Sequence, residues 1–415
     1  MSQCGFRFLL LSMRLLTGII SIILVLFGHA SFAADGLRLQ EFLKSVQAQN
    51  LDLKMEQAKL NAAEAGSSAV NIPPPMVSFS KLTEKEGSAA QGFEISQTVP
   101  FPGKIVKNKS SRNLEAQAQK ANVSARQNDI LSEAKQAFYE YWAAFEKIRI
   151  LRQKKDILSK HLQLARAGIR SDSTMKLHYI KTESDLDLLD NDLEVANQVL
   201  EEGRLKISLL MNLPSATKIP DPEEPTLSPL PTDTDFKSDP PQLQASQLEL
   251  QSFIARESAA KQSWFPDFTF TYKEMGATQM MPQYSEIMVG MTLPFLFPWD
   301  SSSEEKKSSS ERLESELRLK KAQLEINLSK TTSWTRARSL KNQLTTIEEK
   351  LIPKAHRRMQ IVQNIVPRDM ESLQDHRETM EALSDLELKA LDLRLAYEKS
   401  ISELERWKST GDSNE

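Results

Sequence analysis

Two segments of this chain end an alternating strand pattern at a Pro-Phe pair and then enter a very long helical pattern. The first reads "GFEISQTVPFPGK" at 92–104 and the second reads "YSEIMVGMTLPF" at 284–295. Apolar and polar residues alternate in both, which is typical of a strand with one apolar face. Proline cannot donate to a strand ladder, so each strand is expected to end there. The recurrence of this junction indicates an internal duplication.

The rest of the chain repeats around the two junctions. A hairpin is predicted at about 76–99, followed by long helices at about 103–168 and 173–211. A second hairpin at about 267–293 precedes helices at about 300–365 and 369–409, with a kink expected at Pro353. We therefore predict a first structural repeat over 34–213, a proline-rich linker over 214–241 and a second repeat over 242–410.

Residues 1–33 have the pattern of a cleaved secretory signal peptide. Arg7 and Arg14 precede the apolar run "LLTGIISIILVLFG" at 15–28. A retained membrane anchor is the alternative, although this run is short for a full span. Cleavage would remove Cys4, the single cysteine of the chain, and would exclude disulfides and thiol chemistry from the mature protein. These features predict export to the periplasm or outer membrane of a Gram-negative cell.

The composition favours long helices and gives no sign of an enzyme. Aromatic residues make up 7% of the 415 residues, and the net charge of -3 provides no basic field for nucleic acid. Apolar residues recur at spacings of three and four between 186 and 210, which predicts a coiled-coil seam. Because no nucleophile, paired carboxylates or metal-ligand cluster emerges, we expect neither catalysis nor a cofactor.

The two hairpins are too few to form a membrane structure by themselves. Four strands cannot close a barrel, and strand edges cannot stay unpaired in lipid, so several chains would have to pool their strands. Three copies would supply twelve strands, enough for a membrane barrel. Solvated hairpins of a soluble coiled-coil protein are the alternative. In the barrel interpretation the residues expected to face lipid are Val77, Phe79, Phe93, Ile95, Phe268, Phe270, Val289 and Met291.

The duplicated layout and the segment "SQTVPFPGK" at 96–104 resemble the TolC-type outer membrane efflux proteins, in particular the branch found with heavy-metal efflux pumps of the RND class. This resemblance implies a mainly α-helical fold with a membrane β-barrel portion. It further implies a homotrimer in which a 12-stranded outer-membrane β-barrel continues into a periplasmic α-helical barrel. The implied partners are a periplasmic adaptor (membrane fusion) protein and an inner-membrane RND-type or ABC pump.

The resemblance is incomplete at two places. The second junction, "PFLFPWDSSSEEKK", lacks the Gly-Lys of the first. The turn before the last helix, "IVQNIVPRDMESLQD", lacks the glycine that the family commonly carries there.

The junction between strand and helix is the first group of candidate functional residues. Its prolines are expected to end strand pairing, and Gly103 is expected to permit a sharp change of direction. Lys104 and Lys107 are expected to lie at the lipid headgroups. The candidate junction residues are Gln97, Pro100, Pro102, Gly103, Lys104 and Pro294.

The turns at the far end of the long helices are the second group. If this chain has the aperture carboxylates that the resemblance implies, Asp375 is the best match to them. In a trimer each acidic residue at the turn would form a ring of three like charges. Acidic residues also favour helix N-termini for structural reasons. The gate candidates are Arg368, Asp369, Glu371 and Asp375, and the adaptor-docking candidates by analogy are Gly168, Arg170, Ser171, Val366 and Pro367.

No metal site is predicted. The histidines after the signal segment show no pairing at ligand spacing and are interpreted as solvated helix residues: His161, His178, His356 and His376. Methionines cluster around the second hairpin and would suit monovalent copper, but methionine is also an ordinary lipid-facing residue.

The sequence thus predicts an export duct for heavy-metal ions, drugs or other small molecules. The alternatives are the outlet of a type I protein secretion system and, in a different class, a periplasmic coiled-coil protein that transports nothing.

Overall fold

The computed structural model describes residues 36–83, 89–168, 173–232, 239–278, 281–364 and 370–409. The described part of the chain is mainly helical and contains one small antiparallel sheet. The predicted signal peptide at 1–33 lies outside the described residues. Within the described residues, no helix combines the length and apolar character needed to cross a membrane.

Each half of the chain contains a helix, two strands and further long helices, in that order. The elements of the first half are α2 (Leu39–Gln49), α3 (Leu51–Ser68), β1 (Met76–Thr83), β2 (Ala89–Val99), α4 (Pro102–Gly168) and α5 (Ser173–Leu210). Those of the second half are α6 (Pro241–Ala260), the short 3-10 helices η2 (Lys261–Trp264) and η3 (Pro294–Leu296), β3 (Phe268–Met275), β4 (Tyr284–Met291), α7 (Pro298–Thr346), the π-helix η4 (Ile347–Leu351), α8 (Ile352–Asn364) and α9 (Met370–Glu405).

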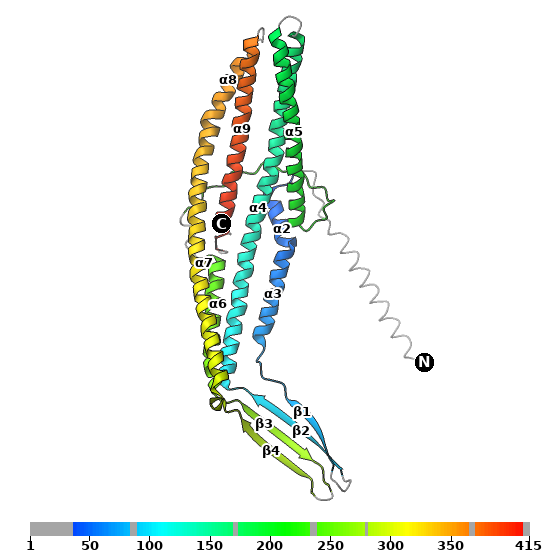
Figure 1. Cartoon of the computed structure of the whole chain (residues 1–415), viewed down its shortest axis with the longest axis vertical. Helices are drawn as coiled ribbons and strands as arrows, with labels where there is room; N and C mark the ends of the chain where they lie inside the picture. Colours follow the sequence, from blue (N-terminus) through cyan, green and yellow to red (C-terminus); the bar gives the residue numbers. More distant parts are fainter. Residues whose placement is uncertain are drawn as a thin grey trace, which may run out of the picture.

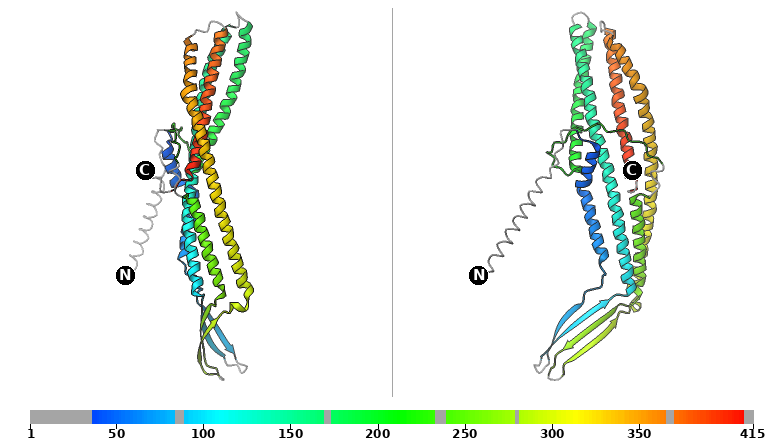
Figure 2. Two further views of the ribbon diagram at one scale, coloured as in Figure 1. Left: turned by 90° about the vertical axis from the view of Figure 1, so that its left-hand side faces the viewer. Right: turned by 180° about the vertical axis from the view of Figure 1, so that it is seen from behind.

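The helices form a long rod with the sheet at one end (Figure 1). The 67 residues of α4 extend over about 100 Å at 1.5 Å per residue, so this helix runs through both halves of the rod. Helices α3 and α5 both pack along α4, while α6 and α9 both pack along α7. The same arrangement is visible from the other sides in Figure 2. Helix α4 also contacts α6 and α9, and these contacts join the two repeats.

The sheet contains all four strands in the order β1-β2-β3-β4. Strands β2 and β3 pair from Gly92 with Met275 to Val99 with Phe268, so the hairpins of the two repeats form one continuous surface. Among the described residues, the outer edges of β1 and β4 have no partner strand.

The strand register separates apolar from polar side chains. Directly paired residues share a face, and Val77, Ile95, Tyr272 and Ile287 form one row across all four strands. This face is strongly exposed: Phe79 is 85% and Ile287 is 78% accessible. It contains all eight residues expected to face lipid, namely Val77, Phe79, Phe93, Ile95, Phe268, Phe270, Val289 and Met291.

The second long helix is interrupted where the kink was expected. Pro353 lacks an N–H, and its ring crowds the carbonyl of Glu349, four residues earlier. The chain accommodates this with the π-helical turn Ile347–Leu351, which ends two residues before the proline. Helices α7 and α8 are therefore two parts of one curved segment (Figure 1).

The main apolar core lies at mid-length of the rod, where α2, α4 and α5 meet the linker. Phe42 of α2 stacks on Phe138 of α4 with ring centroids 6.0 Å apart, and both rings are fully buried. The linker crosses this region and is held by hydrogen bonds from three helices. Tyr141 of α4 donates to Pro220 O at 3.1 Å, Tyr397 of α9 to Ser228 O at 2.7 Å, and Trp334 of α7 to Pro231 O at 3.2 Å.

Replacing Phe138 by alanine should destabilise the protein by about 3–5 kcal/mol, because it leaves a cavity in the main core and removes the stacked pair. Thermal unfolding followed by circular dichroism measures this as a lower midpoint. The matched control is Leu209→Ala on α5, because Leu209 is 77% exposed. Equal midpoints for the two variants would contradict the assignment of the core.

Candidate channel wall and tip

The junction between sheet and helices is held by the carboxylate of Asp267, just before β3. Its Oδ1 accepts hydrogen bonds from Phe101 N and from Lys104 Nζ, both at 2.8 Å. Lys104 also donates to Phe265 O at 3.1 Å. The rings of Phe101 and Phe265 stack with centroids 4.7 Å apart. The start of α4 in the first repeat is thus bonded to the start of β3 in the second.

Two junction residues have surroundings that the sequence did not indicate. The amine of Lys104 is paired with Asp267 and its side chain is 17% exposed, and the position of Lys104 and Lys107 at lipid headgroups stays a prediction. Gly103 does not produce a turn, since it lies in the first turn of α4. A Cβ there would come within 1.8 Å of Gln262 Oε1, so the Gln262 side chain would have to move if residue 103 carried a side chain.

The remaining junction residues lie at the ends of the strands. Gln97 donates through Nε2 to Pro73 O at 2.6 Å, which ties β2 to the segment before β1. Pro100 follows the last residue of β2, and Pro102 begins α4 at a position where a missing N–H has no cost. Pro294 begins the 3-10 turn η3 after β4.

The face of the sheet opposite the apolar one is polar. The register places Ser78, Glu94, Lys273 and Glu286 in one row across the four strands. A second row pairs Thr98 with Thr269, whose hydroxyl oxygens are 3.1 Å apart. One face of the sheet therefore suits hydrocarbon and the other suits water.

Aromatic side chains gather on the surface at the base of the sheet. Phe295, Phe297 and Trp299 follow β4 and are each about 60% exposed. Aromatic residues of this kind are enriched where a membrane barrel meets the interface between lipid and water.

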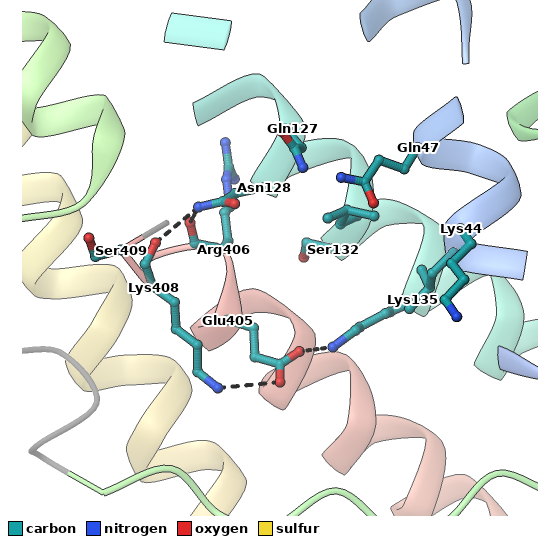
Figure 3. Close-up of a pocket in the computed structure, with 12 residues that line it drawn as sticks. Lys44, Gln47, Gln127, Asn128, Ser132, Lys135, Glu405, Arg406, Lys408 and Ser409 are labelled. Atoms are coloured by element: carbon teal, nitrogen blue, oxygen red, sulfur yellow. Dashed lines mark hydrogen bonds and ion pairs between the residues drawn. The ribbon is translucent and has the colours of Figure 1, made fainter. Parts of the chain in front are cut away.

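A polar pocket of about 350 Å³ lies at mid-length of the rod, where α2 and α4 meet the end of α9 (Figure 3). Lys135 and Lys408 both approach the carboxylate of Glu405 from opposite sides. Asn128 donates to the carbonyl oxygens of Arg406 and Lys408, which anchors the end of α9 on α4. These contacts give the pocket a structural role in joining the two repeats.

Most predicted tip residues cannot be placed. Arg170, Ser171, Val366, Pro367, Arg368 and Asp369 lie outside the described residues, and so does the side chain of Glu371. Gly168 is the last residue of α4, and Asp375 is exposed in the second turn of α9.

The interpretation of the histidines as scattered, solvated residues is wrong for one pair. His161 of α4 and His376 of α9 are in contact, with His161 Nε2 2.7 Å from His376 Nδ1. His161 is 5% exposed. The two residues are 215 positions apart, so their contact depends on how the two repeats pack and leaves no signal in local spacing.

A buried arginine beside this pair was also missed. The Arg377 side chain is 8% exposed and lies 2.5 Å from Asp185 Oδ2 of α5 and 2.8 Å from Glu381 Oε1. The local sequence gives only a weak signal for it, because Met380, three residues later, lies on the same side of the helix, whereas Leu383, six residues later, does not.

The described residues contain no group of three or more histidine, cysteine, aspartate or glutamate side chains placed to hold a metal ion. The methionines of the second hairpin are divided between the two faces of the sheet, since Met288 shares a row with Thr271 and Met291 one with Phe268.

Comparison of the chain with known proteins identifies its fold. No protein-family model and no curated protein sequence matches it. Among solved structures, the outer membrane channel CmeC of Campylobacter jejuni aligns at a TM-score of 0.76 and 12% identity, covering 90% of this chain and 87% of that one. The open state of the MtrE outer membrane channel of Neisseria gonorrhoeae aligns at a TM-score of 0.76 and 13% identity, covering 89% of this chain and 88% of that one. CusC, whose structures concern transmembrane channel formation, aligns at a TM-score of 0.75 and 14% identity, covering 88% of this chain and 90% of that one.

The fold is that of the outer-membrane channels. The resemblance to the TolC-type family predicted from the sequence is thus confirmed at the level of the fold, over almost the whole length of the chain.

Replacing Asp267 by alanine should destabilise the junction by about 1–3 kcal/mol, because the Phe101 N–H and the Lys104 amine lose their shared acceptor in a partly buried place. Limited proteolysis near residue 100 and the thermal midpoint measure the effect. As a control, Glu316→Ala removes an exposed ion pair with Arg312 and should cost less than about 0.5 kcal/mol. A junction equally resistant in both variants would show that Asp267 does not hold it.

Proposed function

We propose that this protein is the outer membrane channel of a tripartite efflux system and has no enzymatic activity. In this proposal three copies form a 12-stranded β-barrel in the outer membrane that continues into a helical barrel in the periplasm. The segment 1–33 directs export and is cleaved.

The observation that carries the proposal is the sheet, which has an exposed apolar face and two unpaired edges. Backbone N–H and C=O groups along β1 and β4 need partners, because unpaired groups are costly in lipid. A second copy of the chain provides them if its β1 pairs with β4 of the first. The strand pairs within the chain are all antiparallel, so the same pattern continues around a closed barrel.

The two faces of the sheet fit this arrangement. The row from Val77 to Ile287 would face lipid, and the row containing Glu94, Lys273 and Glu286 would line a water-filled lumen. Each chain contributes two glutamates and one lysine to this polar row, so a trimer would contribute six glutamates and three lysines. The lumen would then favour cations and polar solutes.

The helices fit a tube wall. Helices α4 and α7 would remain accessible to neighbouring copies. Within the chain, α4 is flanked by α3 and α5, and α7 is flanked by α6 and α9. Exposed leucines on α7 support such contacts, since Leu317, Leu324 and Leu328 are each 60–70% accessible. These side chains would be covered when copies assemble.

The far tip of the rod would be both the gate and the docking surface. We propose that Asp375, together with Arg368, Asp369 and Glu371, lines the narrow end. Gly168, Arg170, Ser171, Val366 and Pro367 would contact the periplasmic adaptor protein, which connects the channel to an inner-membrane pump of the RND or ABC type. The support is the position of α4 and α9, whose ends at these residues lie opposite the sheet (Figure 1).

The transported class is proposed as heavy-metal ions, drugs or other small molecules. Reconstitution into planar bilayers tests the channel, and the expected result is discrete conductance with a preference for cations. A deletion strain should gain sensitivity to one class of ion or drug. Loss of a secreted protein with unchanged sensitivity would instead indicate a protein secretion outlet, and a protein recovered soluble from the periplasm would exclude the channel.

Adjacent residues on opposite faces of β4 give a matched test of membrane insertion. Ile287→Lys places a charge on the apolar face and should cost roughly 2–4 kcal/mol at the middle of the bilayer, strongly reducing the membrane-inserted, heat-modifiable oligomer. Glu286→Lys places the same charge on the polar face and should leave insertion intact. Equal insertion of both variants would contradict a lipid-facing role for this face.

A further inference from the structure

The contact between His161 and His376 joins the two repeats near the tip. His161 belongs to α4 and His376 to α9, and their rings meet edge to face with centroids 4.8 Å apart. His161 lies seven residues before the end of α4 and His376 six residues after the start of α9. At 1.5 Å per residue the pair is therefore about 10 Å from the helix ends at the tip. This contact between the two ring nitrogens is called the histidine link below.

Buried polar residues lie near the histidine link along the same helices. Thr379 of α9 is three residues after His376, and Thr182 of α5 is three residues before Asp185, which pairs with Arg377; both threonines are 1% exposed. Among the described residues, His161 Nδ1 and Arg377 Nη1 form no hydrogen bond. The link itself thus adds a single hydrogen bond to the contact between α4 and α9.

The groups that act on the link come from three helices. Helix α9 contributes His376, Arg377 and Glu381, and helix α5 contributes His178 to the electrostatic environment of His161. Arg377 is itself paired with Asp185 and Glu381, and Lys181 acts on His178. Helix α8 contributes the apolar side chain of Met359 to the adjoining cluster.

These surroundings keep the link uncharged at neutral pH. Burial, the largest cause, acts together with the nearby charges of His376, Arg377 and His178 to lower the pKa of His161 from its usual 6.5 to about 4, while Glu381 opposes them. Burial also lowers the pKa of His376. For His178 the pKa is lowered by burial and by Arg377 and Lys181. A proton added here places a positive charge beside a buried arginine.

We propose that the histidine link is a pH-sensitive connection between the arms of the two repeats, which holds α4 and α9 together at neutral pH and releases them in acid. The hydrogen bond between two imidazoles needs one nitrogen lone pair, so double protonation abolishes it and replaces it with repulsion between like charges.

The direction of the pH effect follows from linkage. Separated arms expose histidines that titrate near their usual 6.5, whereas the joined arms hold His161 unprotonated down to about 4. Between these values the separated state binds more protons, so the joined state loses stability as the pH falls through this range. For His161 alone, a fall from pH 7.5 to 4.0 should shift the ratio of joined to separated arms by on the order of a hundredfold toward separation.

A metal-bridged link is the competing interpretation of two facing imidazoles. It is disfavoured because the described residues supply no third ligand at this place and because Arg377 adds a positive charge beside it. A proton needs no further ligand, and titration of the pair is therefore the better account.

Spin labels on either side of the link test the proposal in the full-length protein in detergent. A Cys4→Ser background carries Lys160→Cys on α4 and Gln374→Cys on α9, both at exposed positions. Dipolar broadening between the labels should decrease as the pH falls from 7.5 to 4.0 in the presence of EDTA. The variant His161→Gln/His376→Gln should remove this pH response, because glutamine keeps a hydrogen bond and does not titrate in this range.

Controls separate the link from general acid effects. His356→Gln removes an exposed histidine of α8 and should leave the response unchanged. If the double variant fails to fold by circular dichroism, the single variants His161→Gln and His376→Gln should each reduce the response, because repulsion between two imidazolium ions needs both histidines. Broadening that is constant with pH, that changes equally in the double variant, or that depends on added Zn²⁺ at constant pH would overturn the proposal.

The consequence for transport rests on the proposed function, whereas the separation of the arms does not. Channel recordings should show a higher open fraction at pH 4.5 than at pH 7.5, and the double variant should lose this difference. A protein whose labels separate in acid but which forms no pores would contradict the channel and retain the histidine link. A protein that forms pores but whose spin labels do not respond to pH would support the channel and contradict the histidine link.

Discussion

The unpaired edges of β1 and β4 are the constraint on which the rest of this structure depends. The sheet exposes an apolar face and leaves two rows of backbone groups without partners in the described chain. An unpaired strand edge tends to pair with another chain in water, and its free backbone groups are not tolerated in lipid. The edges are therefore available for pairing with further copies of the chain, as the proposed trimer requires, and the long helices extend away from the sheet (Figure 1).

The two repeats are joined differently along the length of the rod. At the sheet, β2 pairs with β3 and Asp267 binds the start of α4, so the connection consists of a ladder and a partly buried charge pair. At mid-length, an apolar core and the hydrogen-bonded linker hold α4, α7 and α9 together. Near the tip, an apolar cluster that includes Leu158 of α4 and Met380 of α9 adjoins the polar contact between His161 and His376. The two repeats are thus joined by a strand ladder at one end of the rod and by a mixed apolar and polar contact near the other.

Strand and helix patterns were readable because they depend on neighbours within one element. The alternation at 93–99 and 287–293 predicted the faces of the sheet, since a strand presents its side chains with a period of two. Pro353 predicted the interruption of the last long segment, because proline cannot continue a regular helix. The coarse fold followed from these patterns and from their duplication.

The contacts that the sequence did not reveal involve residues whose partners are distant along the chain. Lys104 pairs with Asp267, and the side chain of Gln262 occupies the space beside Gly103. The contact between His161 and His376 spans 215 positions and depends on the packing of α4 against α9. The sequence by itself thus determined the elements, their faces and the duplication, because local periodicity encodes them. Tertiary structure alone decided which charges pair and which histidines meet, because those contacts arise from the packing of one repeat against the other.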